Sequence, residues 1–259
     1  MNLISAAQKW QDDLSLWSIP EHILNQAETS PWIHPPMLFE IPKQIEMTVS
    51  HQRASEGFPH NGTVLDVGCG GGIGAFGIVP KPSLAIGVDH QGEMLEMFAK
   101  NGAEREIPTR TFEGFWPAVA DSVPAADVVT AYHVVYNVAE IVPFLEELND
   151  HASSRVVIEM PVEHPLSSLT KAWKVFWDLD RPSTPNPSHL MNVLKEMGIS
   201  AKIDYWNGRL RVDRNLEESS EFTRIRLCLP ASRLEEVRSF LEKEPIPTHR
   251  ELATIWWDK

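Results

Sequence analysis

The sequence predicts an α/β protein with a doubly wound, mostly parallel seven-stranded sheet whose last strand is antiparallel. Strand-like apolar runs alternate with amphipathic segments through the middle of the chain, the pattern of parallel strands joined by helices. The strand-like run 64–67 leads directly into a glycine-dense turn at 68–72. The next strand-like run, 84–88, ends in Asp89. Together these observations predict a sheet with a ligand site at its carboxyl edge.

The core elements are expected to alternate from residue 63 onward. An apolar run at 73–79 opens a helix after the glycine turn, and apolar residues recur at helical spacing over 94–98. The expected strands are 63–67, 84–88, near 109–113, 126–131 and 154–160, and the expected helices are 91–100 and 138–150. Since ligands of open α/β sheets lie beyond the carboxyl ends of the strands, Gly68, Asp89 and Tyr132 are expected to gather there.

Residues 1–60 are predicted to form an N-terminal helical preface or lid, and residues 61–259 the main domain. Apolar residues recur at helical spacing over 3–17, which predicts one amphipathic helix. A second helix is expected at about 37–54, bent near Pro42.

The C-terminal part is predicted to add helical embellishments at about 161–198 and 214–245. Helices are expected at 166–179, 188–197 and 232–243, and 218–229 fits a helix or a strand, with the helix favoured. A strand at 199–206 is expected to turn at Asn207-Gly208 into a second strand at 209–212, because this dipeptide favours hairpins. The last strand, 252–257, is expected to return antiparallel to the sheet edge.

The glycine turn carries the strongest functional signal. Glycine lacks a Cβ, so a ligand can lie against the backbone N–H groups of such a turn. The strand before the turn contains an acid, which suits a ligand with an ammonium group better than a pyrophosphate. Asp66 followed by Gly68 and Gly70 resembles the first motif of the class I S-adenosylmethionine-dependent methyltransferases. The resemblance implies that the glycines pass close to the methionine part of the cofactor and that Asp66 supports its amino end.

A second motif follows at the expected distance. An acid about twenty residues beyond the glycine turn suits two hydrogen bonds to ribose hydroxyls. Residues 86–100 look like the second methyltransferase motif and the helix behind it. The resemblance implies S-adenosylmethionine as cofactor and a Rossmann-like methyltransferase domain, with cofactor contacts from Asp66, Gly68, Cys69, Gly70, Asp89, His90, Gly114, Phe115 and Tyr132.

Two alternatives remain open. Residues 72–77 match G-x-G-x-x-G, the pattern of a dinucleotide site, so an NAD-dependent oxidoreductase is the less favoured reading. Against it, four turn residues separate this match from the strand, and a dinucleotide site has no use for Asp66. The other alternative is a protein that binds S-adenosylmethionine without transferring its methyl group.

The acceptor side of the site is less defined. Phe115 or Trp116 is expected either to stack on adenine or to belong to the core. The segment after the fourth strand lacks the Asn/Asp-Pro-Pro motif of methyltransferases that act on planar amines, which favours a small-molecule acceptor of unidentified nature. His133 and Tyr136 are candidate catalytic groups, although a histidine satisfied by a neighbouring carboxylate is the more common arrangement. No metal site is expected.

Composition narrows the partners. With 23 basic and 36 acidic residues, the net charge is −13, which disfavours nucleic acid and anionic lipid as partners. Two cysteines, no signal peptide and no apolar run of about 18 residues predict a cytoplasmic protein without a membrane span. The sequence leaves the oligomeric state open. Nine tryptophans predict either ordinary packing or an aromatic lid made of Trp32, His34, Trp173 and Trp177.

Overall fold

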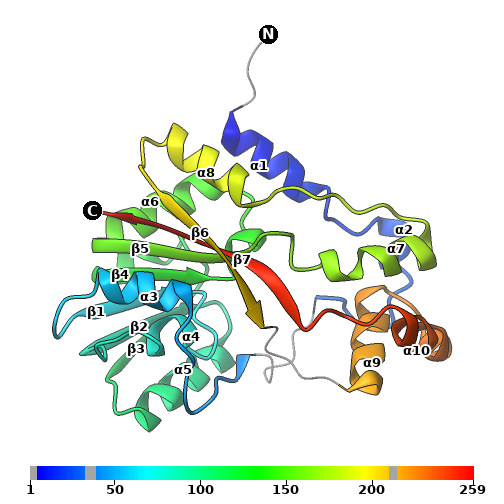
Figure 1. Ribbon diagram of the computed structural model, residues 1–259, viewed down its shortest axis with the longest axis horizontal. Helices are drawn as coiled ribbons and strands as arrows, with labels where there is room; N and C mark the ends of the chain where they lie inside the picture. Colours follow the sequence, from blue (N-terminus) through cyan, green and yellow to red (C-terminus); the bar gives the residue numbers. More distant parts are fainter. Residues whose placement is uncertain (1–4, 33–38, 210–214) are drawn as a thin grey trace.

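A seven-stranded sheet in the order β3-β2-β1-β4-β5-β7-β6 forms the centre of the molecule (Figure 1). The computed structural model describes residues 5–32, 39–209 and 215–259. Strands β1 to β5 are mutually parallel, and β7 runs antiparallel to both β5 and β6. The predicted fold class is therefore confirmed. The strands are β1 (Thr63–Val67), β2 (Leu84–Asp89), β3 (Thr109–Glu113), β4 (Ala126–Tyr132), β5 (Ala152–Pro161), β6 (Lys202–Arg209) and β7 (His249–Asp258).

Successive residues of a strand point to opposite faces of the sheet, and on both faces these residues are apolar. Helices therefore cover both faces. On one face, Val64, Val128 and Val157 share a core cluster with residues of α3 (Val49–Glu56), α4 (Ile73–Phe76) and α5 (Gly92–Glu104). On the other face, Leu65 and Ile158 pack with α1 (Ala6–Ser15), α6 (Ile141–His151) and α8 (Pro187–Glu196). Figure 1 shows α1 lying beside α8 and α6, two helices that are far from it in the sequence.

A third core cluster lies beside the sheet, at the end where α7, α9 and α10 are drawn in Figure 1. It joins α2 (Glu21–Leu24), α7 (Thr170–Trp177), α9 (Leu216–Arg226) and α10 (Leu234–Lys243). Helix α9 confirms the helical alternative for 218–229, and it begins with a capping box between Asn215 and Glu218. None of the helices in the described ranges is long and apolar enough to span a membrane.

The helix expected at 37–54 is wrong in most of its extent. Residues 37 and 38 lie outside the described ranges, and residues 40–48 have no helical structure. Helix α3 begins only at Val49, where the Thr48 hydroxyl accepts a hydrogen bond from the His51 backbone N–H (3.3 Å). Pro42 has no backbone N–H to donate, and the capping box of Thr48 and His51 places the helix start later than apolar spacing alone indicates.

The hairpin expected at Asn207-Gly208 is also wrong. Both residues lie inside β6, where Asn207 pairs with Glu251 and Gly208 with Arg250 of β7. A Cβ on Gly208 would lie 2.4 Å from Leu252 Cδ1, so the glycine accommodates a neighbour across the strands. The turn preference of the dipeptide is overridden by this pairing. The strand predicted at 209–212 falls largely in 210–214, outside the described residues.

Candidate functional site

The glycine turn after β1 is held against the end of β2. Gly68, Gly70 and Gly72 have left-handed backbone conformations, with φ of +68°, +48° and +90°. The N–H groups of Gly68 and Cys69 both donate to the Val88 carbonyl, at 2.8 and 3.0 Å. The turn is therefore fixed to the neighbouring strand at the carboxyl edge of the sheet.

Two other segments pack closely on this turn. A Cβ on Gly68 would lie 2.5 Å from Cγ2 of Val134, in the segment after β4. A Cβ on Gly71 would lie 2.1 Å from the carbonyl oxygen of Phe39. Side chains larger than hydrogen are excluded at both positions. Parts of the chain before β1 and after β4 thus meet at the glycine turn.

Asp66 lies behind the turn rather than on the surface. Its side chain is buried, and Oδ1 accepts a hydrogen bond from the Thr130 hydroxyl of β4 at 3.0 Å. A Cβ on Gly74 would lie 2.7 Å from the same oxygen, so the start of α4 packs directly on the carboxylate. Asp66 therefore contacts β4 and the start of α4 directly, and its support of the amino end of a cofactor stays a prediction.

Asp89 connects the two sequence motifs. One carboxylate oxygen accepts a hydrogen bond from the Gly70 N–H and the other from the Gln91 N–H, both at 3.1 Å. Each carboxylate oxygen has a second lone pair, which suits a ribose hydroxyl donor. The side chain is 8% exposed, at the tip of β2. Asp89 therefore both shapes the turn and presents an acceptor at the strand end.

An aromatic pair lies next to Asp89. The rings of His90 and Phe115 stack with centroids 4.7 Å apart, and Phe115 is 69% exposed. Gly114 has φ of +155°, and its N–H donates to the Asp89 carbonyl at 2.9 Å. Trp116 instead donates its indole N–H to the Phe144 carbonyl at 3.3 Å and packs, partly buried, against the core. Of the two aromatic candidates, Phe115 is the one placed at the edge of the site.

The segment after β4 brings a histidine and a buried acid together. His133 Nε2 lies 2.8 Å from Oε1 of Glu159, a residue of β5 that is 1% exposed. The His133 backbone N–H also donates to the Glu159 carbonyl at 2.7 Å. Tyr132 is buried, and its ring centroid lies 5.7 Å from that of His51. Glu159 is not among the site residues predicted from the sequence. An acid within the otherwise apolar run 156–160 is the feature that could have indicated it.

Tyr136, the other catalytic candidate, lies in the core. It is 4% exposed, and its hydroxyl donates to the Pro161 carbonyl at 2.9 Å. Its ring contacts those of Trp10 and His164. Burial raises the pKa of the Tyr136 hydroxyl above its usual value. These contacts support a packing role.

Cys69 is part of the turn but is closed off from solvent. Burial raises the pKa of its thiol well above the usual value, and the nearby Asp66 and Asp89 raise it further. A protonated, buried thiol is a poor nucleophile. The structure therefore supports the role of a small residue that fits the turn.

Of the residues proposed for an aromatic lid, Trp173 and Trp177 belong to the third core cluster. Trp32 is 49% exposed, and His34 lies outside the described residues. Trp173 is 1% exposed in the third core cluster, and Trp177 donates its indole N–H to the Leu227 carbonyl at 2.7 Å. For Trp173 and Trp177 the structure supports packing.

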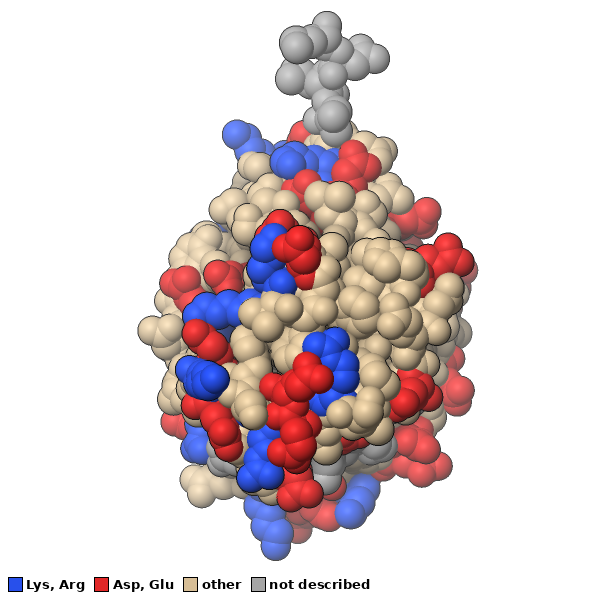
Figure 2. Space-filling model, turned by 90° about the vertical axis from the view of Figure 1, so that its right-hand side faces the viewer, with Lys and Arg blue, Asp and Glu red and all other residues tan. Residues whose placement is uncertain are grey.

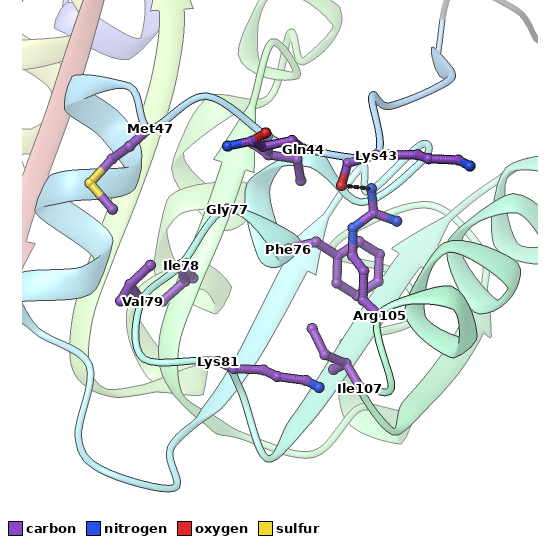
Figure 3. Close-up of a pocket in the computed structure, with 11 residues that line it drawn as sticks. Lys43, Gln44, Met47, Phe76, Gly77, Ile78, Val79, Lys81, Arg105 and Ile107 are labelled. Atoms are coloured by element: carbon purple, nitrogen blue, oxygen red, sulfur yellow. Dashed lines mark hydrogen bonds between the residues drawn. The ribbon is translucent and has the colours of Figure 1, made fainter.

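Two open cavities lie away from the glycine turn. The first, of about 350 Å³, lies between residues 43–47, the end of α4 and the end of α5 (Figure 3). There Arg105 lies over the Phe76 ring and donates to the Lys43 carbonyl at 3.4 Å. The second, of about 660 Å³, lies at the start of α6. Within the described part of the chain, no group of three or more metal-ligating side chains is present.

Comparison with known proteins shows similarity to a methyltransferase domain over the part of the chain that contains this turn. Residues 65–155 match the family model of the methyltransferase domain. No curated protein matches the chain in sequence. Among solved structures, the YcgJ protein of Bacillus subtilis is 17% identical, with a TM-score of 0.56 over 81% of this chain and 95% of that one.

Two further structures have the same fold. A Bacillus halodurans protein provisionally assigned as a methyltransferase is 15% identical, with a TM-score of 0.53 over 81% of this chain and 96% of its own. A cyclopropane-fatty-acyl-phospholipid synthase-like protein of Lactobacillus casei is 11% identical, with a TM-score of 0.53 over 96% of this chain and 100% of its own.

The fold and the glycine turn define a class I, Rossmann-like methyltransferase architecture. The part of the chain from 65 to 155, which contains the glycine turn, Asp89 and His133, is the part that matches the methyltransferase domain model. S-adenosylmethionine is the cofactor that goes with this domain. The predictions of family, fold and cofactor are thus confirmed at that level.

Proposed function

We propose that this protein transfers the methyl group of S-adenosylmethionine to a small-molecule acceptor. The observation that carries the proposal is the hydrogen bond from the Gly70 N–H to the Asp89 carboxylate. It joins the turn suited to the methionine part and the acid suited to the ribose into one continuous surface at the carboxyl edge.

The residues around this contact fit the cofactor in order. Gly68, Cys69 and Gly70 receive the methionine part, with Asp66 behind them. Asp89 holds the ribose, His90, Gly114 and Phe115 border the adenine, and Tyr132 closes the side of β4. The bound cofactor supplies the electrophilic methyl group. The contribution of the protein is therefore alignment of the acceptor and exclusion of water.

The dinucleotide pattern at 72–77 has a packing role instead. A Cβ on Gly74 would lie 2.7 Å from the Asp66 carboxylate, and one on Gly77 would lie 2.4 Å from the His51 ring. These glycines allow close approach of protein side chains. This argument favours S-adenosylmethionine over NAD.

The charge of the surface favours a small acceptor. The net charge of −13 repels phosphate backbones. On the face shown in Figure 2, Lys and Arg side chains are interspersed with Asp and Glu. We place the reaction in the cytoplasm, in keeping with two buried free thiols.

Calorimetric titration with S-adenosylhomocysteine, with NAD run beside it, tests the proposal. We expect micromolar binding of S-adenosylhomocysteine alone, and at least tenfold weaker binding by Asp89→Ala. The matched control is Asp121→Ala, which removes an exposed acid outside the site. Binding of NAD alone, or an unchanged dissociation constant in Asp89→Ala, would contradict the assignment. Binding without methyl transfer to any acceptor would favour a cofactor-binding protein.

A further inference from the structure

The cavity between residues 43–47, the end of α4 and the end of α5 has a cationic lining in an acidic protein (Figure 3). Lys43, Lys81 and Arg105 line it, and none of the described residues of its lining is an acid. The whole chain carries a net charge of −13. Three cations around one cavity of such a chain create a local positive potential that attracts anions.

Most of this positive charge has no acidic partner. Within the described residues, Lys43 and Arg105 form no ion pair. Lys81 Nζ lies 3.6 Å from a carboxylate oxygen of Glu106, whose side chain is 92% exposed. A pair that exposed to solvent is weak. An anionic ligand would therefore not have to displace a strong internal partner.

Arg105 is held in place by neutral groups. Its Nη2 donates to the Pro42 carbonyl at 2.6 Å and its Nη1 to the Asn101 carbonyl at 3.0 Å. The guanidinium also lies 5.7 Å from the centroid of the Phe76 ring. These partners fix the orientation of the guanidinium but carry no negative charge. Its full positive charge is therefore available to a carboxylate, which pairs well with the planar guanidinium group.

The rest of the lining is mostly aliphatic. Ile78 and Ile107 are buried, whereas Met47 and Val79 are 52% and 56% exposed. In the view of Figure 3, Met47 and Val79 lie on the left of the cavity and Arg105 lies on the right. The lining therefore has an apolar side and a charged side.

This division of the lining defines the ligand chemistry. An inorganic anion would contact the cations and leave the apolar side unused, and a hydrocarbon would do the reverse. The face of the Phe76 ring is already covered by Arg105, so the remaining apolar contacts are aliphatic. The volume of about 350 Å³ is at the lower end of the range of small-molecule sites.

We propose that this cavity is a second binding site, separate from the cofactor site, for a carboxylate with a short alkyl chain. The carboxylate binds to Lys43, Lys81 and Arg105, and the alkyl chain packs on Met47 and Val79. The site does not depend on the proposed methyl transfer.

The other cavity serves as an internal reference because its charge is opposite. Asp121, Glu140, Glu146 and Glu147 line it, and none of the described residues of its lining is a lysine or an arginine. A carboxylate is repelled from such a lining. The indole of Trp116, which also lines it, should therefore be unaffected by the ligand.

The first test is an NMR titration of protein labelled in the methionine methyl groups and the tryptophan indoles, with octanoate as the probe. We expect the Met47 methyl signal to shift with a dissociation constant of about 10⁻⁴ to 10⁻³ M. The signals of Trp116 and of Met191 on α8 should stay in place. An unshifted Met47 signal, or equal shifts at Trp116 and Met191, would overturn the proposal.

A panel of related ligands separates the two parts of the proposed contact. Acetate lacks the chain and octan-1-ol lacks the charge, so each should bind at least tenfold more weakly than octanoate. Between butyrate and octanoate, each added methylene group should tighten binding about two- to fourfold, as expected for a methylene group that is largely buried. Equal binding of acetate or of octan-1-ol would overturn the proposal.

The second test removes charge from the cavity. The double variant Lys43→Gln/Lys81→Gln is expected to bind octanoate at least fivefold more weakly and to keep the wild-type circular dichroism spectrum. The matched control Lys195→Gln/Lys243→Gln changes the net charge equally at exposed positions of α8 and α10 and should bind within twofold of wild type. Equal losses in both variants would mean unspecific attraction and overturn the site.

The final arm distinguishes this site from the cofactor site. The shift of Met47 with octanoate is expected to persist when S-adenosylhomocysteine is present at saturation. Competitive displacement of octanoate by S-adenosylhomocysteine would place octanoate in the cofactor site and overturn the inference. Failure of the protein to bind S-adenosylhomocysteine would overturn the proposed function alone, since the octanoate titration and its variants test the second site without it.

Discussion

At the scale of single residues, Gly68 and Gly198 differ in what surrounds the same kind of backbone. Both have left-handed conformations, with φ of +68° and +79°. A Cβ on Gly68 would meet Val134 at 2.5 Å, whereas a Cβ on Gly198 would have no atom within 4 Å. Substituting Gly198 therefore tests the effect of backbone strain alone, whereas substituting Gly68 tests backbone strain together with a steric clash.

We expect Gly198→Ala to lower the free energy of unfolding by about 1 kcal/mol through backbone strain alone. Gly68→Ala should lower it by about 2–4 kcal/mol, because the added methyl group also displaces Val134. Urea titration followed by circular dichroism measures both values. The double variant Gly68→Ala/Val134→Ala should recover part of the loss. Equal costs at the two glycines would contradict the packing described for the turn.

The residues predicted to bind the cofactor could be proposed from the sequence because their motif is local. Asp66, Gly68 and Gly70 lie within five positions, and Asp89 follows at the end of the next strand. Glu159 was not identified as the partner of His133 because their contact depends on the register of β4 and β5. Phe39 likewise reaches the glycine turn only through the folded path of the segment before α3.

At the scale of elements, Arg155 connects helix α3 to the sheet. From β5 it donates to the Arg53 carbonyl at 2.7 Å and to the Asp258 carboxylate at 2.7 Å. Its guanidinium lies 4.4 Å from the Trp256 ring centroid, and its side chain is 10% exposed. The stem and the charge of Arg155 therefore both contribute to holding α3.

Arg155→Ala is expected to lower the free energy of unfolding by about 1–3 kcal/mol, because it removes the packing of the Arg155 side chain on Trp256 and its hydrogen bond to the Arg53 carbonyl. The control Arg238→Ala removes an arginine that is 51% exposed on α10 and should change the value by less than about 0.5 kcal/mol. Thermal and urea unfolding of both variants provide the comparison. A loss in Arg155→Ala no larger than in Arg238→Ala would show that α3 is held by its other contacts.

Elements with strong periodic patterns were predicted well, and those decided by capping or long-range pairing were not. The strand β3 agrees with its predicted range, and β7 was expected to be antiparallel. The start of α3 depends on a capping box at Thr48, and β6 continues through Asn207-Gly208 because β7 pairs with it. Local turn preferences of these residues are small compared with the pairing of two strands.

At the scale of the whole molecule, the N-terminal segment contributes to the main core. Trp10 of α1 is completely buried in the cluster that contains Leu65 and Ile158, and its indole N–H donates to the Val138 carbonyl at 2.9 Å. The division at residue 60 into an N-terminal lid and a main domain stays a prediction. In packing, residues before it and residues after it share one core.

Trp10→Ala is expected to cost about 3–5 kcal/mol of unfolding free energy, the usual loss for a large buried aromatic side chain. Leu16→Ala, which shortens a side chain 60% exposed just after α1, should change stability by less than about 0.5 kcal/mol. Chemical unfolding followed by tryptophan fluorescence measures both. A small loss in Trp10→Ala would indicate that the N-terminal segment is an independent lid.

The stability of the molecule should also depend on pH through His164. Burial, and then the charge of Arg181, lower the pKa of His164 to about 3, and its ring stacks on Trp17 at 3.8 Å. The unfolded chain binds a proton near pH 6.5, whereas the folded protein does not. The contribution of the neutral His164 ring to the free energy of unfolding is therefore fully present above pH 6.5 and is lost as the pH falls towards 3.

Between pH 7 and pH 5 this group should remove about 2 kcal/mol of unfolding free energy. His164→Phe retains an aromatic ring on Trp17 but cannot titrate. Between pH 7 and pH 5 the unfolding free energy of the wild type should therefore fall by that amount relative to the unfolding free energy of the variant. Urea unfolding at the two pH values measures it. Parallel pH profiles would mean that His164 is protonated in the folded state.

The buried thiol of Cys69 makes the glycine turn observable in solution. Cys69 and Cys228 are both free and buried, so a thiol reagent reaches either one only when the surrounding structure opens. In a Cys228→Ser background, the labelling rate of Cys69 therefore measures how often the turn opens. A ligand that occupies the turn should slow this labelling, and the extent of the slowing gives the affinity of the ligand without any acceptor or turnover.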